Sequence, residues 1–432
     1  MSEVTVVGAG LAGCEAAWQL ARQGISVRLI EMKPERFSPA HKAPNFAELV
    51  CSNSLKAEHV TNASGLLKAE MEKIGSLILE KAREARVPAG TALAVDRDRF
   101  SEGITRAIAG HPLIRVERRV AESLPEEPCV VATGPLTDPA LLDALNALPG
   151  LSALHFFDAA APIVTAESLN MDILFRQSRN GAGDDYLNSP MDRAQYDAFY
   201  QALTGAELSP LHDFEKNLVF EGCLAVEILA SRGHDTLAFG PMRPVGLVDP
   251  KTGRTPYAVV QLRQENEAGT LYNLVGFQTR LKWGEQKRVL SMIPGLEQAE
   301  FVRYGVMHKN TYLNSPDVLG RNFSLNGRPL TRFAGQLTGV EGYVESAASG
   351  MIAGLNLGRA LRGCPEIDFG GETVMGALEA HVRTKVHNFQ PMNANFGILA
   401  PLDRKVRNKK SRYEELAVRS LSTIDRLMED IR

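Results

Sequence analysis

Hydrophobic positions near the N-terminus predict a strand, a helix and a second strand in quick succession. Val4–Val7 is a short β-branched run, Cys14–Arg22 is rich in alanine and stops before Gly24, and Ser26–Ile30 is a second apolar run. A turn of sequence Gly8-Ala9-Gly10-Leu11-Ala12-Gly13 joins the first strand to the helix. The pattern therefore predicts a βαβ unit whose first connection is a glycine-rich turn.

This glycine-rich turn has the spacing of a dinucleotide site. Gly8 permits the tight turn, Gly10 lets a pyrophosphate approach the backbone, and Gly13 lets the helix lie close to the strand. Glu31 follows Gly13 by eighteen positions, close to the spacing at which an acidic side chain meets the ribose hydroxyls. The alternative is a turn used only for packing. We expect the dinucleotide to be held by Glu31 and by Gly8, Ala9, Gly10, Leu11, Ala12 and Gly13.

Two later segments favour FAD over NAD. The apolar run Pro128–Ala132 leads into Thr133-Gly134-Pro135, a turn that many FAD proteins place beside such a unit. The run Thr331–Ala334 leads into Gly335-Gln336 and then into a helix of small residues over 344–361, whose N-terminus can face the flavin. We therefore expect Gly134, Gly335 and Gln336 at the cofactor.

The stretch between about 155 and 300 has a different pattern, with short helices, polar turns and β-like runs such as Pro256–Arg263 and Leu271–Thr279. Its glycine-rich segment 181–186 lacks a preceding strand and a third glycine, so we expect NAD(P)H to bind transiently, without a domain of its own. The predicted fold class is α/β. Residues 1–155 and 300–432 form a Rossmann-type FAD-binding domain, and residues 156–299 form an inserted α+β domain.

Composition and the absence of certain sequence signals limit the class of protein and the compartment that we expect. The 432 residues are 44% hydrophobic and 23% charged with a formal net charge of −3, which is typical of a globular protein and argues against a general nucleic-acid coat. No export signal and no run of eighteen apolar residues are visible, so we expect a cytoplasmic protein without a membrane span. The nine histidines are scattered, and no metal site is expected.

Five cysteines are the main candidates for chemistry. Cys51 lies in a polar stretch with a lysine nearby, and Cys223 is 172 positions further on, so the two do not form the close pair of a dithiol reductase. From its local sequence alone, each of Cys51 and Cys223 is more commonly an inert thiol. Cys14, Cys129 and Cys364 are interpreted as structural.

Two further groups combine aromatic character or charge in ways that suit nucleic acid. Trp283 stands between Lys282 and Lys287-Arg288, which suits an unpaired base or a pterin as well as an exposed turn. Residues 404–412 form a basic run, for which phosphate contact competes with simple solvation.

Several segments together resemble the folate- and FAD-dependent tRNA uracil-5-methyltransferases nearly end to end. The family pattern has Met-Pro after the second cysteine, where this chain has Leu224-Ala225. The most specific matching segments are Cys51-Ser52-Asn53-Ser54-Leu55-Lys56, Phe220-Glu221-Gly222-Cys223, Arg232-Gly233, Gly240-Pro241-Met242-Arg243-Pro244-Val245-Gly246-Leu247, Phe277-Gln278-Thr279-Arg280-Leu281-Lys282-Trp283-Gly284-Glu285-Gln286 and Arg303-Tyr304-Gly305-Val306-Met307-His308.

The resemblance implies that methylenetetrahydrofolate donates a one-carbon unit, that FAD reduced by NAD(P)H takes part, and that a T-loop uridine of tRNA becomes 5-methyluridine. It implies Cys223 as the nucleophile that adds to carbon 6 and Cys51 as the base near the flavin. His308 is a candidate for stacking on the folate pterin, with a core histidine as the alternative. The basic run 404–412 and the inserted domain are candidates for contact with tRNA.

Three other functions remain open from sequence. A relative that modifies the tRNA wobble uridine also uses FAD and a one-carbon folate, but such chains are longer. A flavin oxidoreductase acting on a small acid or a disulfide would turn over without RNA. A tRNA-binding flavoprotein that acts as a folding chaperone would survive the loss of either cysteine. The oligomeric state and the choice between NADH and NADPH are likewise open.

Overall fold

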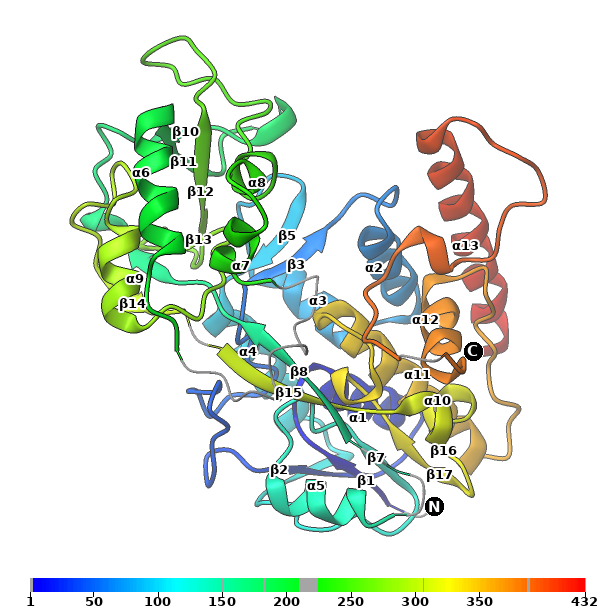
Figure 1. Cartoon of the computed structure of the whole chain (residues 1–432). Coiled ribbons are helices and arrows are strands. Elements are labelled where there is room, and N and C mark those ends of the chain that lie inside the picture. The colour runs from blue at the N-terminus through cyan, green and yellow to red at the C-terminus, as the bar shows by residue number, and fades with distance from the viewer. Residues whose placement is uncertain are drawn as a thin grey trace.

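The protein is built around two six-stranded sheets and two smaller ones. The structure, a computed structural model, describes residues 3–148, 151, 153–181, 183–209, 224–305, 307–386 and 389–431. In Figure 1 the first large sheet lies at the bottom of the molecule and the second at the upper left, with the C-terminal helices on the right. Each large sheet has its own hydrophobic cluster.

The first sheet has the order β16-β17-β7-β1-β2-β6 and is parallel except for β16 at one edge. Because β17 pairs with β7 about 200 residues away from it in sequence, both ends of the chain contribute to one sheet. This confirms the predicted α/β class with a Rossmann-type domain. The strands are β1 (Val4–Val7), β2 (Val27–Glu31), β6 (Ile114–Arg118), β7 (Cys129–Val131), β16 (Ser324–Leu325) and β17 (Arg328–Phe333).

Helices α1 (Leu11–Arg22) and α11 (Tyr343–Leu361) pack closely against each other beside this sheet. Gly350 and Gly354 of α11 make this possible. A Cβ atom on Gly350 would lie 2.1 Å from the carbonyl oxygen of Ala12, and one on Gly354 would lie 2.5 Å from that of Ala16. The small residues of both helices therefore let the two N-termini converge on one edge of the sheet.

The second sheet is antiparallel and has the order β10-β11-β12-β13-β9-β14. Its strands are β9 (Ile163–Thr165), β10 (Phe175–Arg176), β11 (Leu187–Met191), β12 (Ala258–Gln264), β13 (Leu271–Leu274) and β14 (Phe301–Arg303). The helices beside it are α6 (Arg193–Thr204), α7 (Val226–Ser231), α8 (Thr236–Phe239) and α9 (Trp283–Leu290).

Two small sheets lie between these parts. The antiparallel pair β8 (Ala153–Ala159) and β15 (Met307–Leu313) carries the chain out to the second sheet and back, and a three-stranded sheet has the order β3-β5-β4. The elements of this region are β3 (Ser54–Ala57), β4 (Arg86–Val87), β5 (Ala92–Val95), α2 (Ala63–Ile74), α3 (Leu77–Glu84) and α4 (Arg97–Ala109). Helix α5 (Pro139–Asn146) lies beside the first sheet, at the bottom of Figure 1.

The C-terminal part adds α10 (Ser315–Val318), α12 (Val374–Arg383) and α13 (Lys409–Ile431). The buried carboxylate of Glu70 on α2 joins them. It accepts hydrogen bonds from the backbone amides of Val374 and Met375 at the start of α12, and from the hydroxyl of Ser420 on α13. Among the helices that the structure describes, none is both long enough and apolar enough to cross a membrane.

Candidate active site

A pocket opens at the carboxyl ends of β1, β2 and β7, where the glycine-rich turn lies. Gly8 has a φ of +94°, and a Cβ atom there would lie 2.6 Å from the carbonyl oxygen of Ala132. A Cβ atom on Gly13 would lie 1.8 Å from the carbonyl oxygen of Gly8, whereas one on Gly10 would meet no atom within 4 Å. Gly8 and Gly13 therefore pack the turn tightly, while Gly10 leaves open space of the kind that a pyrophosphate needs.

Glu31 ends β2 at the wall of this pocket. Its carboxylate accepts hydrogen bonds from the backbone amides of Ala9, at 2.7 Å, and of Lys33, at 3.0 Å. Each carboxylate oxygen keeps a further lone pair, so the side chain is oriented and can still accept hydrogen bonds from ribose hydroxyls. α1 has no side-chain cap at its N-terminus, which leaves its first amides for phosphate oxygens.

The three other predicted cofactor residues line the same pocket. Gly134 has a φ of +71° with open space around its Cα, and Gly335 has a φ of +80° beside Ala12. The amide of Gly335 donates to the hydroxyl of Ser349 on α11 at 2.7 Å, and the Gln336 side chain donates to Glu341. The residues present therefore fit a dinucleotide cofactor with a flavin at the α11 end.

Cys51 follows Val50, which lines this pocket, and it contacts Tyr343, the first residue of α11 and another lining residue. Its Sγ is 3.0 Å from the hydroxyl oxygen of Tyr343. The same oxygen accepts hydrogen bonds from the backbone amides of Cys51, at 2.9 Å, and Ser52, at 3.3 Å. A phenol hydroxyl has one hydrogen and two lone pairs, so with both amides donating to it, the hydroxyl hydrogen points to Sγ.

Tyr343 therefore donates to the thiol of Cys51, an arrangement that favours the thiolate. The ring is partly exposed because it lines the pocket, while the hydroxyl end is deeply buried. Burial, and then the adjacent Cys51 sulfur, raise the pKa of Tyr343 well above its usual value. The phenol thus stays protonated and remains a hydrogen-bond donor throughout the pH range of most enzymes.

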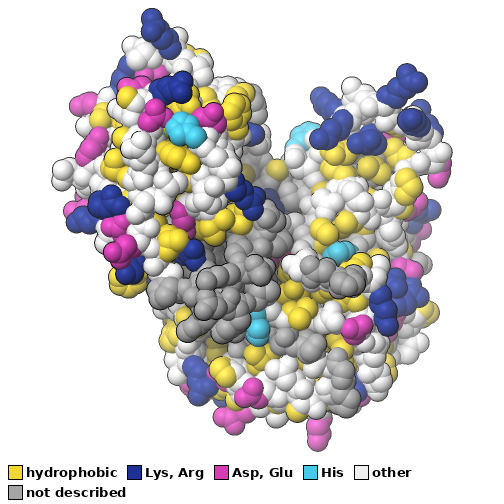
Figure 2. Space-filling model, in the orientation of Figure 1, with side chains coloured by type: hydrophobic (Ala, Val, Ile, Leu, Met, Phe, Trp, Pro, Cys, Tyr) yellow, Lys and Arg dark blue, Asp and Glu magenta, His cyan; other side chains and the backbone are white. Residues whose placement is uncertain are grey.

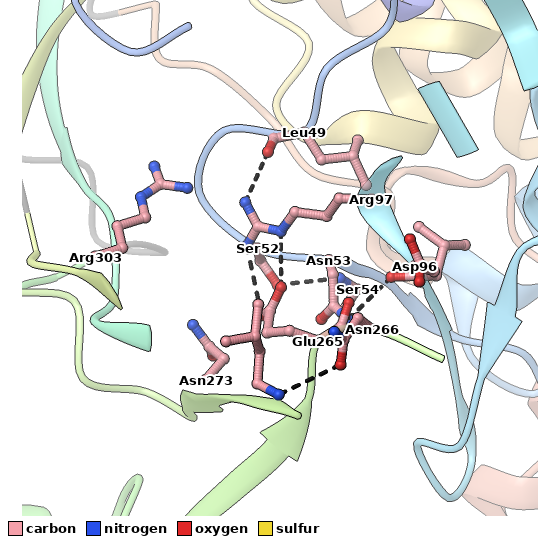
Figure 3. Close-up of polar contacts among 12 residues, drawn as sticks. Leu49, Ser52, Asn53, Ser54, Asp96, Arg97, Glu265, Asn266, Asn273 and Arg303 are labelled. Atoms are coloured by element: carbon pink, nitrogen blue, oxygen red, sulfur yellow. Dashed lines mark hydrogen bonds and ion pairs between the residues drawn. The ribbon is translucent and has the colours of Figure 1, made fainter. Parts of the chain in front are cut away.

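Two arginines hold the backbone just before Cys51. Arg97, at the start of α4, donates to the carbonyl oxygen of Leu49 at 2.7 Å and pairs with the buried carboxylate of Glu265 at 2.7 Å, as Figure 3 shows. Arg303, at the end of β14, donates to the carbonyl oxygen of Val50. Burial, and then the charge of Arg97, lower the pKa of Arg303. Two cations near Cys51 add to the preference for a thiolate.

The residues just after Cys51 are held by β12 of the second sheet. Arg263 donates to the hydroxyl of Ser52 at 2.7 Å and to the side-chain oxygen of Asn53 at 2.9 Å. The amide of Asn53 donates to the carbonyl oxygens of Val95 and Gln264 at 3.0 and 2.9 Å. The Cys51 loop, residues 49–53, is thus fixed by β12 and β14 of the second sheet, by β5 of the small sheet and by helices α4 and α11.

Other predicted site residues lie elsewhere. Trp283 begins α9, is 65% exposed and stacks on Tyr304 with ring centroids 5.8 Å apart; it does not line the cofactor pocket. Its neighbour Lys282 is paired with Glu207 and Arg288 with Glu285, so part of the predicted phosphate-binding charge there is neutralised by carboxylates.

Two predicted residues cannot be placed in this geometry. Cys223 lies outside the described residues. His308 is in β15, opposite Asp158 of β8, and its side chain lies outside the description.

The cysteines interpreted as structural differ in their surroundings. Cys14 is fully buried on α1, where burial and then Glu31 raise its pKa well above the usual value, and burial also raises the pKa of Cys129 in β7. Cys364 lies after the end of α11 and is half-buried. The two buried thiols are therefore poor nucleophiles.

Sequence patterns do not predict Arg97, Arg263 or Glu265 as site residues, nor the role of Tyr343. Arg97 begins a helix in an ordinary amphipathic pattern, Arg263 lies near the end of an apolar strand, and Glu265 directly follows that strand. The only available signal was two charged residues at the end of a buried run, since such charges need partners.

The fold and the pocket define the class of Rossmann-type FAD-binding flavoproteins. The family model described as "Glucose inhibited division protein A" matches residues 3–365. The crystal structure titled "Structure of Aquifex aeolicus GidA in the form II crystal" superimposes with a TM-score of 0.70 at 14% identity, covering 100% of this chain and 74% of that one. At that identity the likeness shows the fold alone.

Sequence relatives are much closer. A protein of Heliobacterium modesticaldum named "Methylenetetrahydrofolate--tRNA-(uracil-5-)-methyltransferase TrmFO" is 56% identical, covering 98% of each chain. A protein of Desulforudis audaxviator with the same name is 57% identical, covering 98% of this chain and 97% of its own. The chain belongs to the glucose inhibited division protein A family and, within it, to the methylenetetrahydrofolate–tRNA-(uracil-5-)-methyltransferases.

Proposed function

We propose that this protein transfers a one-carbon unit from methylenetetrahydrofolate to carbon 5 of a T-loop uridine in tRNA. FAD, reduced by NAD(P)H, supplies the hydride that completes the methyl group. The names of the relatives support the folate donor and the tRNA uracil. The observation that carries the proposal is Tyr343, because its ring lines the cofactor pocket while its hydroxyl contacts the Cys51 thiol.

The chemistry requires two thiol roles. Carbon 5 of uracil is a poor nucleophile until a thiolate adds to carbon 6, and we assign that addition to Cys223. Once the new bond at carbon 5 has formed, the hydrogen on that carbon must leave as a proton. We assign its removal to Cys51, whose sulfur accepts the Tyr343 hydrogen bond and lies near Arg97 and Arg303.

Binding roles follow the same division. The glycine-rich turn, Glu31, Gly134, Gly335 and Gln336 hold FAD, and we propose His308 and Trp283 for the folate pterin. A T-loop uridine must leave its stack to reach this site. Since tRNA, folate and NAD(P)H are substrates of the cytoplasm, we propose that the reaction takes place there. We also propose residues 1–155 and 300–432 as the FAD-binding domain and 156–299 as the inserted domain.

The test follows label from two donors into unmodified tRNA transcript. Methylenetetrahydrofolate labelled in its one-carbon unit is supplied with NAD(P)H, in parallel with labelled S-adenosylmethionine, and nucleosides are then analysed. Label in 5-methyluridine from folate alone is expected. No label from either donor in a yellow preparation would favour a flavin oxidoreductase, and label in the wobble position would favour wobble-uridine modification.

Cysteine variants then test the assigned roles. Cys51→Ala and Cys223→Ala should each abolish nearly all product, while Cys364→Ala, which removes a thiol beyond the end of α11, should leave it unchanged. Full methyl transfer by both variants would contradict the thiol mechanism. Unchanged assistance of tRNA folding by both variants, with no methyl transfer by the wild-type protein, would favour a tRNA-binding chaperone without chemistry.

A further inference from the structure

A groove lies between residues 396–406 and the beginning of α13. Its lining combines apolar side chains, basic side chains, the ring of Tyr413 and one acid, Asp403. The apolar lining comes from Phe396, Leu399, Pro401, Leu402 and Leu416, and the basic lining from Arg404, Lys405 and Arg412. The groove is separate from the cofactor pocket and shares none of its residues.

Positive charge dominates the rim of this groove. Six of the nine residues 404–412 are lysine or arginine, and all six are exposed. Arg404 pairs with Glu415 at 2.8 Å. Within the described part of the chain, Lys405 and Arg412 form no ion pair. Figure 2 shows these dark blue side chains on the upper right lobe, beside a hollow that separates it from the other lobe.

Contacts within the protein shape the groove, which distinguishes it from a solvated tail. The rings of Phe396 and Tyr413 stack with centroids 4.2 Å apart. The guanidinium of Arg412 lies 5.5 Å from the Tyr413 ring centroid, close enough for a cation–π contact. Arg419 of α13 donates to the carbonyl oxygens of Ala400 and Pro401, so the floor of the groove is fixed to the helix. The floor of the groove and the guanidinium of Arg412 are therefore positioned by contacts within the protein.

A short chain of polar contacts links the segment after Cys51 to the segment that leads into the groove. The side chain of Lys56, at the end of the Cys51 segment, donates to Asn393 at 3.1 Å and pairs with Glu345 of α11 at 2.8 Å. Glu345 also accepts from the amide of Ala394 at 3.0 Å. Phe396 follows two residues later and forms the groove wall. The groove and the Cys51 segment are therefore joined by described contacts, and a substrate as large as tRNA can span both.

We propose that the groove binds the sugar–phosphate backbone of the tRNA substrate next to the loop that carries the target uridine. The assignment rests on the proposed function. Riboses face the apolar side, and phosphates contact Lys405 and Arg412. The backbone of a nucleic acid carries negative phosphate charges at regular spacing. Cations without ion-pair partners at the rim of the groove match this charge. The aromatic pair orients the cations and does not itself stack on a base, because Phe396 already covers one face of Tyr413.

The experiment compares three double variants of the full-length flavoprotein. Lys405→Gln/Arg412→Gln removes the two unpaired cations that line the groove. Lys405→Arg/Arg412→Lys keeps their charge. Arg407→Gln/Lys410→Gln removes the same charge from the same basic run without touching the groove lining. Filter binding to tRNA transcript is measured between 50 and 200 mM salt, alongside KM and kcat for methyl transfer.

The lining double variant should bind tRNA roughly tenfold more weakly near 100 mM salt, and its slope of log affinity against log salt should fall by about 2, from two lost phosphate contacts. KM for tRNA should rise while kcat and NAD(P)H oxidation without tRNA stay unchanged. The charge-keeping variant should behave as wild type. If the Arg407/Lys410 variant lost as much affinity, tRNA would be attracted by the basic run as a whole, and the proposal that the groove binds tRNA would be wrong. If the lining variant bound tRNA as tightly as wild type, the proposal would also be wrong, and the groove would be assigned to another partner, such as an acidic protein segment. Failure of the proposed function can be told apart from failure of the groove proposal. In the first case wild-type protein would transfer no label to tRNA, while the binding comparison would still show whether the groove binds tRNA.

Discussion

Replacing Tyr343 by phenylalanine tests whether the flavin pocket and the thiol are coupled. The change replaces the hydroxyl group by hydrogen but keeps the ring that lines the pocket. It deprives the Cys51 sulfur of a donor and leaves the amides of Cys51 and Ser52 without the acceptor they share. The protein should therefore stay yellow while its thiol chemistry changes.

The magnitude follows from the strength of the lost bond. A hydrogen bond to a charged group contributes about 1.5–3 kcal/mol. At about 1.4 kcal/mol per pH unit, the midpoint of thiolate formation should rise by about 1–2 pH units. Each amide left unpaired also costs roughly 1–3 kcal/mol of stability, so the melting temperature should fall by several degrees.

The assay is the pH dependence of Cys51 alkylation. Protein is pulsed with iodoacetamide at pH 5 to 10, and the Cys51 peptide is quantified by mass spectrometry, which separates it from the other cysteines. Tyr196→Phe is the matched control, because Tyr196 is also a buried tyrosine whose pKa burial raises, to about 12, but its hydroxyl donates to His234. A Tyr343→Phe midpoint equal to or below that of wild type would refute the donor role.

Three further predictions concern the turn, the C-terminal part and the buried ion pair. Gly13→Ala should lose FAD, seen as a colourless preparation, because its Cβ would lie 1.8 Å from a carbonyl oxygen, while Gly284→Ala in open space should stay yellow. Burial raises the pKa of Glu70 to about 7, although its hydrogen bonds favour the charged form. The protonated carboxyl therefore contributes stability below about pH 4.5, and this stability is lost as the pH rises through 7. Denaturant unfolding should show wild type losing roughly 3 kcal/mol more than Glu70→Gln between pH 4.5 and 7; parallel curves would contradict this. Arg97→Gln should lower the melting temperature, because it leaves Glu265 buried and unpaired. The double variant Arg97→Gln/Glu265→Gln should recover stability but not methyl transfer. Recovery of both would mean that Arg97 has no role in the reaction.

Short-range patterns predicted the nucleotide-binding part well because its signals are local. The strand expected over Val4–Val7 has those bounds, while the helix expected to begin at Cys14 begins at Leu11, inside the turn, since the last glycine belongs to the helix. The run Leu271–Thr279 was predicted as one β-like segment, but β13 ends at Leu274. A glycine with a φ of +79° follows two residues later, and periodicity alone does not mark such a turn.

The candidate site was harder to predict because its contacts are long-range. The cysteine, the glycines and the acid are recognisable by type and spacing, but the hydroxyl of Tyr343 meets Cys51 across 292 positions and Arg263 meets Asn53 across 210. Nothing in a single sequence pairs residues so far apart. Their meeting depends on the return of the chain at β17 and on how β12 is placed.

The hold of β12 on the Cys51 loop limits how this protein can be re-engineered. A chimera that exchanges the antiparallel sheet for that of another flavoprotein would keep the cofactor pocket, since none of its lining residues comes from that sheet. It would nevertheless release the thiol, unless the donor strand brought an arginine and a glutamate in the places of Arg263 and Glu265. A yellow chimera would then not show that the exchange had worked. The colour shows only that the pocket at the first sheet still binds flavin, whereas catalysis also needs the Cys51 loop, which the second sheet holds.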